Sequence, residues 1–473
     1  MNATFNGDIA LGTVKSAGRA GMLFGGMYSG SYAQFAINDC VIGGHLTCAY
    51  SGYDLDMTAD NWDDKNGNVD GGYIWGYLVK GRYGLDPFTP KYGDAASHSG
   101  AEQLTAWQQG YMDIHHISTG RGNCTFMILP DGTTMMVDAG DNGPANDDDT
   151  KLDRVPNESL TPAEWIVRYV THFTEEAGLP AKLDHMLVSH FHYDHVGVGT
   201  TAYPWSPDGK YLMTGVPYVG STLEVDNFVD RAYPDYDFPY TGYFDKGIFR
   251  DYVMMDNYLK FLNSDYNRLN NISGFKVGAS DQFALKTPRN DFLIRNIYAN
   301  GQLWTGSGVS SESIVPSGLT QSDLQSTENQ WSAVLNISYG NFDYHTGGDI
   351  NGTELFDAEY GVAARIGETD VFHCNHHACD DAMRGDVLLA TRPQVFVVPA
   401  WEKEAHPGDE ALARMINYGD IFAAAPAAKD GMKANGHVVV RVYEGGSKFQ
   451  IFVLNDRSTD YEVIHKTEKY TSK

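Results

Sequence analysis

The sequence predicts an α/β fold built as a layered sandwich of sheets and helices. Two observations lead to this prediction. From residue 112 onward, short apolar segments typical of strands alternate with segments of helical character, and the strands fall into two sets with helices between them. The chain has 473 residues, more than one compact core usually holds, so we expect one large domain with elaborations or two domains.

The composition excludes several classes of protein. Apolar residues make up 42% of the chain and charged residues 20%, which is typical of a packed globular protein rather than a disordered one. No stretch approaches the ~18 consecutive apolar residues of a membrane-spanning helix. With 34 basic and 61 acidic residues the net charge is −27, and such a body repels phosphate backbones. Nucleic acid is therefore an unfavoured partner.

The cysteines and the N-terminus leave the compartment open. Five cysteines are too few for a disulfide framework, although Cys40 with Cys48 and Cys374 with Cys379 are spaced so that they could pair. The first residues show no basic segment leading into an apolar run, so no signal peptide is visible. A secreted, periplasmic or surface protein whose signal was removed would look the same as a cytoplasmic one. Nothing in the sequence indicates the oligomeric state.

Residues 1–105 differ from the rest and are predicted to form a β-rich N-terminal region. They hold 18 of the 51 glycines, together with many tyrosines, and short apolar pieces lie between the glycines. Residues 20–26 resemble one unit of the glycine-rich GLUG repeats of surface proteins, and residues 69–76 are a fainter echo. Because two units are too few for a stable stack, we expect an elaboration packed on the main domain, residues 106–473.

The first set of strands begins with a hairpin. Residues 125–129 and 133–137 are apolar and flank Asp131-Gly132, a dipeptide typical of hairpin turns. Thr161-Pro162-Ala163-Glu164 is a capping box with proline at the first helical position, so it predicts a helix to about Phe173. Residues 185–189 form a short buried strand.

The later elements repeat this alternation. Residues 205–290 are predicted to be an insertion, rich in tyrosine, with a helix over 252–269. Residues 335–339 alternate between apolar and polar side chains, as in a half-buried strand, and residues 393–399 are a buried strand. Residues 437–454 predict a closing hairpin with its turn at 444–447.

A histidine cluster follows the strand at 185–189 and carries the chemistry. His190, His192, Asp194 and His195 lie within six residues. Neutral imidazole is the commonest metal ligand near neutral pH, and residues two apart in an extended segment point the same way. His190 and His192 can therefore bind one metal, while Asp194 and His195 lie where the chain turns and can reach a second metal.

At this point the sequence resembles the metallo-β-lactamase fold hydrolases. Their signature His-x-His-x-Asp-His is present as the cluster just described, and an apolar run ends in Asp138-Ala139-Gly140. Further motifs follow in the family's order: Gly348-Asp349, His376-His377 and His406-Pro407. The set covers about residues 110 to 455 and resembles the branch that contains phosphorylcholine esterases and ComEC-type enzymes. The resemblance implies a four-layer αββα sandwich.

The resemblance also implies a role for each residue. His190, His192 and one of His376 and His377 would bind one metal, and Asp349 would bridge to the second. The second metal would be held by Asp194, His195 and His406. Asp138 would orient the loop by hydrogen bonding without being a ligand. The branch's usual His-His-Gly-Ser reads His376-His377-Ala378-Cys379 here, so the choice between the two histidines stays open.

The predicted chemistry is metal-dependent hydrolysis. Two divalent metals would lower the pKa of bound water towards ~7 and so supply hydroxide as the nucleophile, in the site formed by Asp194 and its neighbours. His376 or His377, whichever is not a ligand, would protonate the leaving group. Ligand type favours zinc, with manganese or iron as alternatives.

The expected substrate is a phosphodiester or related ester, on a small molecule or linked to a glycan or lipid. A nuclease and a lactonase or β-lactam hydrolase are the alternatives within the hydrolases. From another class, the chain could be a glycan-binding surface protein whose hydrolase domain is vestigial. The complete ligand set argues against that alternative, because a decayed site would have lost ligands.

Overall fold

The computed structural model describes residues 102–473 except residues 144–150, 201 and 354. The predicted β-rich region, with its GLUG-like segments and with Cys40 and Cys48, lies outside the described residues apart from 102–105. The boundary near residue 105 therefore stays a prediction. Cys124, Cys374 and Cys379 are free thiols. Among the described residues no helix has the length and apolar character needed to cross a membrane.

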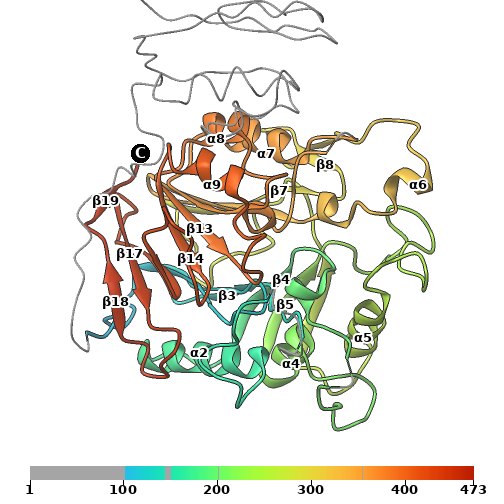
Figure 1. The fold of residues 1–473 in the computed structure, drawn as a ribbon, viewed down its shortest axis with the longest axis horizontal. Coiled ribbons are helices and arrows are strands. Elements are labelled where there is room, and N and C mark those ends of the chain that lie inside the picture. The colour runs from blue at the N-terminus through green and yellow to red at the C-terminus, as the bar shows by residue number, and fades with distance from the viewer. Residues whose placement is uncertain (1–101, 144–150, 201, 354) are drawn as a thin grey trace, which may run out of the picture.

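The fold is a sandwich of two sheets between two layers of helices, so the predicted αββα architecture is confirmed (Figure 1). The first sheet has ten strands in the order β18-β17-β16-β1-β2-β3-β4-β5-β6, with β19 paired to β17. Its strands are β1 (Met112–His116), β2 (Thr125–Ile128), β3 (Thr134–Val137), β4 (Leu183–Val188), β5 (Val225–Asp230), β6 (Leu269–Gly274), β16 (His437–Val442), β17 (Lys448–Leu454), β18 (Val463–Lys466) and β19 (Tyr470–Thr471).

The second sheet has nine strands in the order β15-β14-β13-β12-β11-β10-β7-β8-β9. Its strands are β7 (Phe292–Ala299), β8 (Gln302–Trp304), β9 (Ser311–Ser313), β10 (Val334–Tyr339), β11 (Phe342–Thr346), β12 (Val371–His373), β13 (Val395–Pro399), β14 (Asp420–Ala424) and β15 (Ala434–Asn435). In each sheet one part is parallel, β3 to β6 in the first and β11 to β15 in the second, and the remainder is antiparallel.

Helices cover the outer face of each sheet. In Figure 1, α2, α4 and α5 lie against the first sheet and α7, α8 and α9 lie against the second. The helices are α2 (Pro162–Glu176), α3 (Tyr193–Val196), α4 (Gly215–Thr222), α5 (Tyr252–Leu262), α6 (Gln321–Leu324), α7 (Ala358–Ile366), α8 (Gly385–Thr391) and α9 (Asp409–Met415), with 3-10 turns η2 (Glu328–Trp331) and η3 (Asn375–Ala378).

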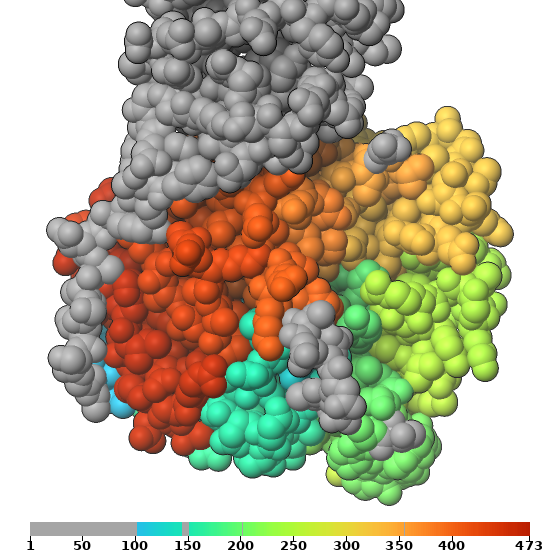
Figure 2. All heavy atoms as spheres, in the orientation of Figure 1, coloured from blue at the N-terminus to red at the C-terminus, as the bar shows by residue number. Residues whose placement is uncertain are grey.

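Alternation along the strands explains the layers. In β13, Val395 and Val397 pack between the two sheets, whereas Phe396 and Val398 pack against the helices. Successive side chains of a strand point to opposite faces, so a strand that is apolar on both faces must be covered on both. Figure 2 shows the resulting surface. The first half of the chain, in green, and the second half, in orange, are in contact there.

The sequence placed most of these elements. The hairpin of β2 and β3, the strand β10 and the closing hairpin of β16 and β17 are as predicted. Thr161 and Glu164 form the predicted capping box at the start of α2, which extends to Glu176.

Residues 205–290 depart from the prediction in two ways. Within this range, predicted as an insertion, β5 and β6 extend the first sheet. The helix predicted over 252–269 is wrong in its length, because α5 ends at Leu262. There Asn267 donates from Nδ2 to the carbonyls of Phe261 and Leu262, at 3.0 and 3.2 Å. Polar side chains that hydrogen-bond the local backbone in this way stop a helix.

Candidate metal centre

The predicted site residues lie in loops that leave the carboxyl ends of parallel strands. Asp138 follows β3, and the histidine cluster follows β4 in the first sheet. In the second sheet, Asp349 follows β11, His377 follows β12 and His406 follows β13. Since the carboxyl ends of neighbouring parallel strands meet at one edge of a sheet, both sheets present their polar loops at the same place.

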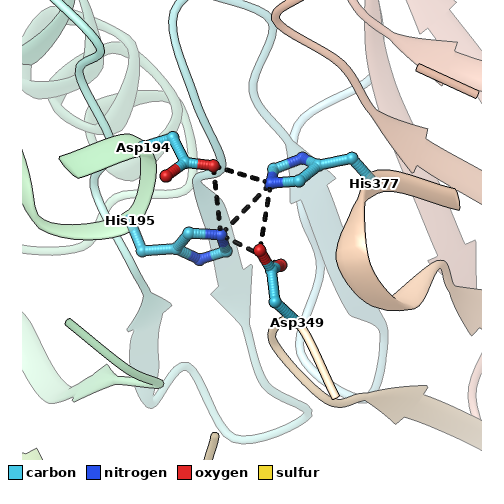
Figure 3. A group of neighbouring side chains, drawn as sticks. All are labelled: Asp194, His195, Asp349 and His377. Atoms are coloured by element: carbon cyan, nitrogen blue, oxygen red, sulfur yellow. Dashed lines mark hydrogen bonds and ion pairs between the residues drawn. The ribbon is translucent and has the colours of Figure 1, made fainter. Parts of the chain in front are cut away.

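Four of these residues form a compact group. Asp194, His195, Asp349 and His377 are buried and offer four donor atoms that all lie within 4.8 Å of one another. The Nε2 atom of His377 lies 2.9 Å from Asp194 Oδ2 and 3.2 Å from His195 Nε2. The Nε2 atom of His195 lies 3.1 Å from Asp349 Oδ1. Figure 3 shows the four side chains converging, two from the green segment around α3 and two from the tan segments of the second sheet.

A second group shares Asp349 with the first. It consists of His190, His192 and Asp349. His190 Nε2 lies 3.2 Å from His192 Nδ1 and 3.6 Å from Asp349 Oδ2. His190 is fully buried, whereas His192 is half-buried. Asp349 Oδ2 lies 3.6 Å from the Nε2 atoms of both His190 and His377, so this carboxylate is common to the two groups.

Hydrogen bonds fix which ring nitrogen of two histidines faces the centre. His195 places Nδ1 2.8 Å from Asp138 Oδ2, and His377 donates from Nδ1 to the carbonyl of Pro399 at 2.9 Å. In both rings Nε2 is left for the centre. A partner on the far nitrogen of this kind holds a metal-ligating imidazole in one orientation and raises its basicity.

Asp138 does more than hold His195. Its carboxylate also accepts hydrogen bonds from the backbone N–H of Ser189 at 2.7 Å, the Ser189 hydroxyl at 2.8 Å and Asn123 Nδ2 at 3.1 Å. Asp138 itself has a φ of 60°, a left-handed conformation that a non-glycine residue adopts only where its surroundings require it. Asp138 thus connects Ser189, after the end of β4, to His195. These hydrogen bonds correspond to the orienting role that the family resemblance implies for Asp138.

Two glycines allow the loops to approach closely. The turn at residues 120–123 packs on the cluster, and the backbone N–H of Asn123 donates to the carbonyl of Asp194 at 2.8 Å. A Cβ atom at Gly122 would lie 2.5 Å from this carbonyl oxygen, and one at Gly140 would overlap it. Glycine at both positions therefore allows this close approach, and the turn at residues 120–123 supports the backbone of Asp194.

The electrostatics of the centre favour a cation. Burial by itself would raise the pKa of Asp349, but His195 and His377 hold that pKa well below its ordinary value. Burial would lower the pKa of His377, but Asp349 and Asp194 raise it to about 9. Burial lowers the pKa of His192 to about 3, so this ring stays neutral. His195 and His377 hold the pKa of Asp194 below its ordinary value in the same way, so both carboxylates are ionised, and the neutral His192 ring can donate a lone pair.

The spacing of the donors fits a bound metal ion. Two donors, each 2.0–2.1 Å from a tetrahedral zinc ion, are about 3.3 Å apart. Five of the six pairs of residues in the first group place donor atoms between 2.9 and 3.7 Å apart, with the nearer Asp349 oxygen taken for each partner. Imidazole and carboxylate donors also suit zinc, and manganese or iron can use the same set. The residues present therefore fit the metal ions that the sequence predicts.

The grouping differs from the expected allocation at two histidines. His377 lies with Asp194 and His195, not with His190 and His192, and His406 belongs to neither donor group. The His406 ring packs on His377 at a tilt of 44° with its centroid 4.9 Å away, and its Nδ1 atom is buried without a hydrogen-bond partner. Trp401 covers it on another side, at 5.1 Å.

His376 lies outside both donor groups, with its ring centroid 6.5 Å from that of His377. Both residues are left-handed, with φ of 45° and 52°. His376 Nδ1 lies 2.6 Å from Asp381 Oδ1, and Cys379 completes a separate, more exposed trio. The sequence left open whether His376 or His377 is a ligand. Of the two, His377 is the one whose ring lies with the donor group.

Sequence reasoning did not single out several residues that support the centre. Ser189 directly precedes the cluster, and a hydroxyl residue at this position is a sequence signal for a hydrogen bond that supports the ligands. Glu328, whose Oε1 accepts the backbone N–H of Phe191 at 2.9 Å, belongs to no motif. Only the folded arrangement brings Glu328 to the cluster.

Comparisons with known proteins add little to this picture. No protein-family model matches the chain, and no curated protein matches it. Among the solved structures that match is the crystal structure of the short form of human tRNase Z, with 10% sequence identity and a TM-score of 0.28, over 68% of this chain and 97% of that chain. A likeness this weak carries no argument about fold or function, and both rest on the residues of this chain.

Proposed function

We propose that the chain is a metal-dependent hydrolase of the metallo-β-lactamase superfamily that holds two divalent cations. The observation that carries the proposal is the pair of donor groups that share Asp349. A single carboxylate common to two groups of imidazoles is the arrangement that a two-metal site requires. The order of the motifs along the sequence supports the same superfamily, and we place the chain in its ComEC-like and phosphorylcholine esterase-like branch.

Each residue has a role in this proposal. His190, His192 and Asp349 hold one cation, and Asp194, His195, His377 and Asp349 hold the other. A pair of divalent cations activates water as a nucleophile and stabilises negative charge in the transition state. Asp138 keeps the His195 ring in place from behind.

His376 is the proposed proton donor to the leaving group. Of the adjacent pair His376 and His377, it is the one that lies outside the two donor groups, and it is half-buried, so a substrate can approach it. Burial would lower the pKa of His376, but the Asp381 carboxylate next to Nδ1 raises it above its ordinary value. A protonated imidazole of this kind can act as a general acid near neutral pH.

The proposed substrate is a phosphodiester or related ester. Two divalent cations bring +4 charges, and Asp194 and Asp349 remove two, which leaves +2 in a protein of net charge −27. Next to the centre, Arg250 lies over the ring of Tyr193 and is paired with Asp251 at 3.2 Å, so the positive charge comes from the two cations. This local positive charge suits an anionic group on a small or glycan- or lipid-linked substrate better than a long polyanion.

Metal analysis combined with a substrate panel tests the proposal. The purified chain should contain two equivalents of zinc, manganese or iron, and it should hydrolyse chromogenic phosphodiesters. The panel also includes phosphorylcholine, lactones, cephalosporins and a single-stranded nucleic acid. Turnover of lactones or cephalosporins alone would contradict the phosphodiester assignment, and turnover of nucleic acid would favour a nuclease.

The glycan-binding alternative has its own outcome in the same experiment. Retention of polysaccharide by a chain that binds no metal and hydrolyses nothing would favour a surface protein with a vestigial domain.

A matched control for the metal analysis and the substrate panel is Asp291→Ala, which removes an exposed carboxylate at the start of the second sheet. This variant should keep the metal content and turnover of the natural chain.

A further inference from the structure

One short segment, residues 328–333, touches three loops that carry candidate ligands. It comprises η2 and the two residues that lead into β10. Glu328 accepts the backbone N–H of Phe191, and the Asn329 side-chain amide lies 3.1 Å from His376 Nε2. The Ser332 hydroxyl accepts the backbone N–H of Asp349 at 3.1 Å, and the Ala333 N–H donates to the carbonyl of Ser189 at 2.9 Å. The segment therefore connects the ligand loops of both sheets.

Glu328 is itself held by a buried arginine. Arg231, at the end of β5, donates from Nε to Glu328 Oε1 at 2.8 Å and from Nη2 to Oε2 at 2.6 Å. The two side chains are 0% and 2% exposed. Arg231 also donates from Nη1 to Asn300 Oδ1 at 2.9 Å. A two-bonded pair of this kind has a fixed geometry as well as a strong interaction.

Both partners of this ion pair act on Phe191. Glu328 receives its backbone N–H, and the Arg231 guanidinium stacks on its ring with Cζ 4.8 Å from the centroid. Phe191 stands between His190 and His192 in the chain; its ring packs on Phe244 and Tyr258, whereas both imidazoles lie with Asp349. Fixing the peptide and the ring of Phe191 therefore fixes the direction in which both imidazoles point.

Stability alone does not account for a buried ion pair at this position. Removing two charges from water costs several kcal/mol per ion, and replacing such a pair by apolar residues is often neutral or stabilising. The pair adds a hydrogen-bond acceptor for Phe191 that an apolar pair could not supply. A role in holding the loop explains that acceptor.

We propose that Arg231 and Glu328 are positioning residues that hold His190 and His192 in the direction needed to bind a cation. Through Ser332, the same segment ties Asp349, the carboxylate shared by both groups, to this loop. The proposal deepens the function proposed above and rests on its metal centre. It assigns no contact with substrate to either residue.

Two double variants separate the acceptor from the ion pair. Arg231→Met with Glu328→Gln removes both charges but keeps an oxygen that can accept the Phe191 N–H. Arg231→Met with Glu328→Met removes the charges and the acceptor at similar volume.

Titration of the metal-free proteins with zinc in competition with a chromophoric chelator gives the affinity for each cation. The methionine pair should bind one of the two cations about 10–100-fold more weakly, as expected when a ligand loses its support. The glutamine pair keeps the acceptor but lacks the guanidinium on the Phe191 ring, so its affinity should lie between those of the methionine pair and the natural chain.

The chain offers a matched control in a second buried ion pair. Arg441 in β16 donates to Asp113 in β1 from Nε at 2.9 Å and from Nη2 at 2.6 Å, far from the ligand loops. Arg441→Met with Asp113→Leu should leave both cation affinities unchanged. If the loss with Glu328→Met comes from positioning, excess zinc should restore turnover, which a general folding defect would not allow.

Equal cation affinities in the two Arg231 double variants would overturn the proposal. If the methionine pair does not fold, the single variant Glu328→Asp gives the same comparison, because it keeps the charge opposite Arg231 but shortens the reach to Phe191. Failure of the proposed function gives a different result. If the natural chain binds zinc but hydrolyses no substrate, the proposed reaction is wrong, and the cation affinities of the variants can still be compared.

Discussion

The two donor groups of the candidate centre are built differently although they share Asp349. The group around His377 has four donors, all buried, and two of its imidazoles have their second nitrogen held by Asp138 or by the Pro399 carbonyl. The group around His190 has three donors, and one of them, His192, is half-buried.

This difference suggests different tasks for the two groups. Metal sites with a full set of protein ligands are typically structural or tightly held, whereas sites with three protein ligands keep a position for water or substrate. We therefore expect the group around His377 to retain its cation more tightly. The group around His190 and His192 includes the half-buried His192. Its cation should exchange with solvent and bind the substrate.

Removing the shared carboxylate should have the largest effect. In Asp349→Ala both groups lose a donor, so the variant should bind neither cation tightly, and turnover should fall by about 10³-fold or more. Metal analysis after dialysis and steady-state kinetics measure both effects. The control is Asp343→Ala, which lies in β11, the strand before Asp349, and accepts a hydrogen bond from Ser338. If Asp349→Ala kept one cation at full affinity, the two groups would be independent rather than joined.

Removing one histidine from each group should have a smaller and unequal effect. His377→Asn should lose the tightly held cation, and His192→Asn should lose the exchangeable one, each with a fall in turnover on the order of 10²-fold. Zinc titration distinguishes them, because the cation that remains in His192→Asn should be the tighter of the two. The opposite ranking would reverse the assignment of the groups.

The smallest effect concerns the support of His377 and depends on pH. Glu359 in α7 accepts from Asn375 Nδ2 at 3.1 Å and from the Met383 N–H at 2.8 Å, beneath the turn that carries His377. Burial raises the pKa of Glu359 from 4.5 to about 8. Between these values the folded chain keeps a proton that the unfolded chain releases, so the free energy of unfolding falls as pH rises.

Glu359→Gln removes this titration and keeps the acceptor oxygen. Its free energy of unfolding should decline less steeply between pH 4.5 and 8, by at most about 1.4 kcal/mol per pH unit. Urea unfolding at a series of pH values measures the slope, with Glu175→Gln, on the exposed face of α2, as the control. Parallel slopes for Glu359→Gln and the natural chain would show that Glu359 is ionised when folded.

The sequence predicts much of this molecule because the signals are local. The capping box at Thr161 and the turn at Asp131-Gly132 specify an element from a few adjacent residues, and the cluster from His190 to His195 specifies its chemistry in the same way. The four-layer architecture follows from strands that are apolar on both faces.

The remainder depends on contacts between distant residues. Nothing local shows that His376 and His377 adopt left-handed conformations, and this backbone decides which ring reaches the centre. Glu328 is 97 residues from Arg231 and 137 from Phe191, so no spacing could reveal their contact. The strands β5 and β6 lie within a polar, tyrosine-rich range whose composition hid their pairing with β4.

The distance along the chain between the ligands has a consequence for biosynthesis. His195 and His377 are separated by 182 residues, and β1 completes its place in the first sheet only when it pairs with β16. A ribosome makes the chain from its N-terminus, so the cluster after β4 emerges long before its partners. Contacts of such long sequence separation form late. Cation uptake should therefore follow synthesis of nearly the whole polypeptide, and nascent chains stalled before residue 377 should not acquire the ion held by that histidine.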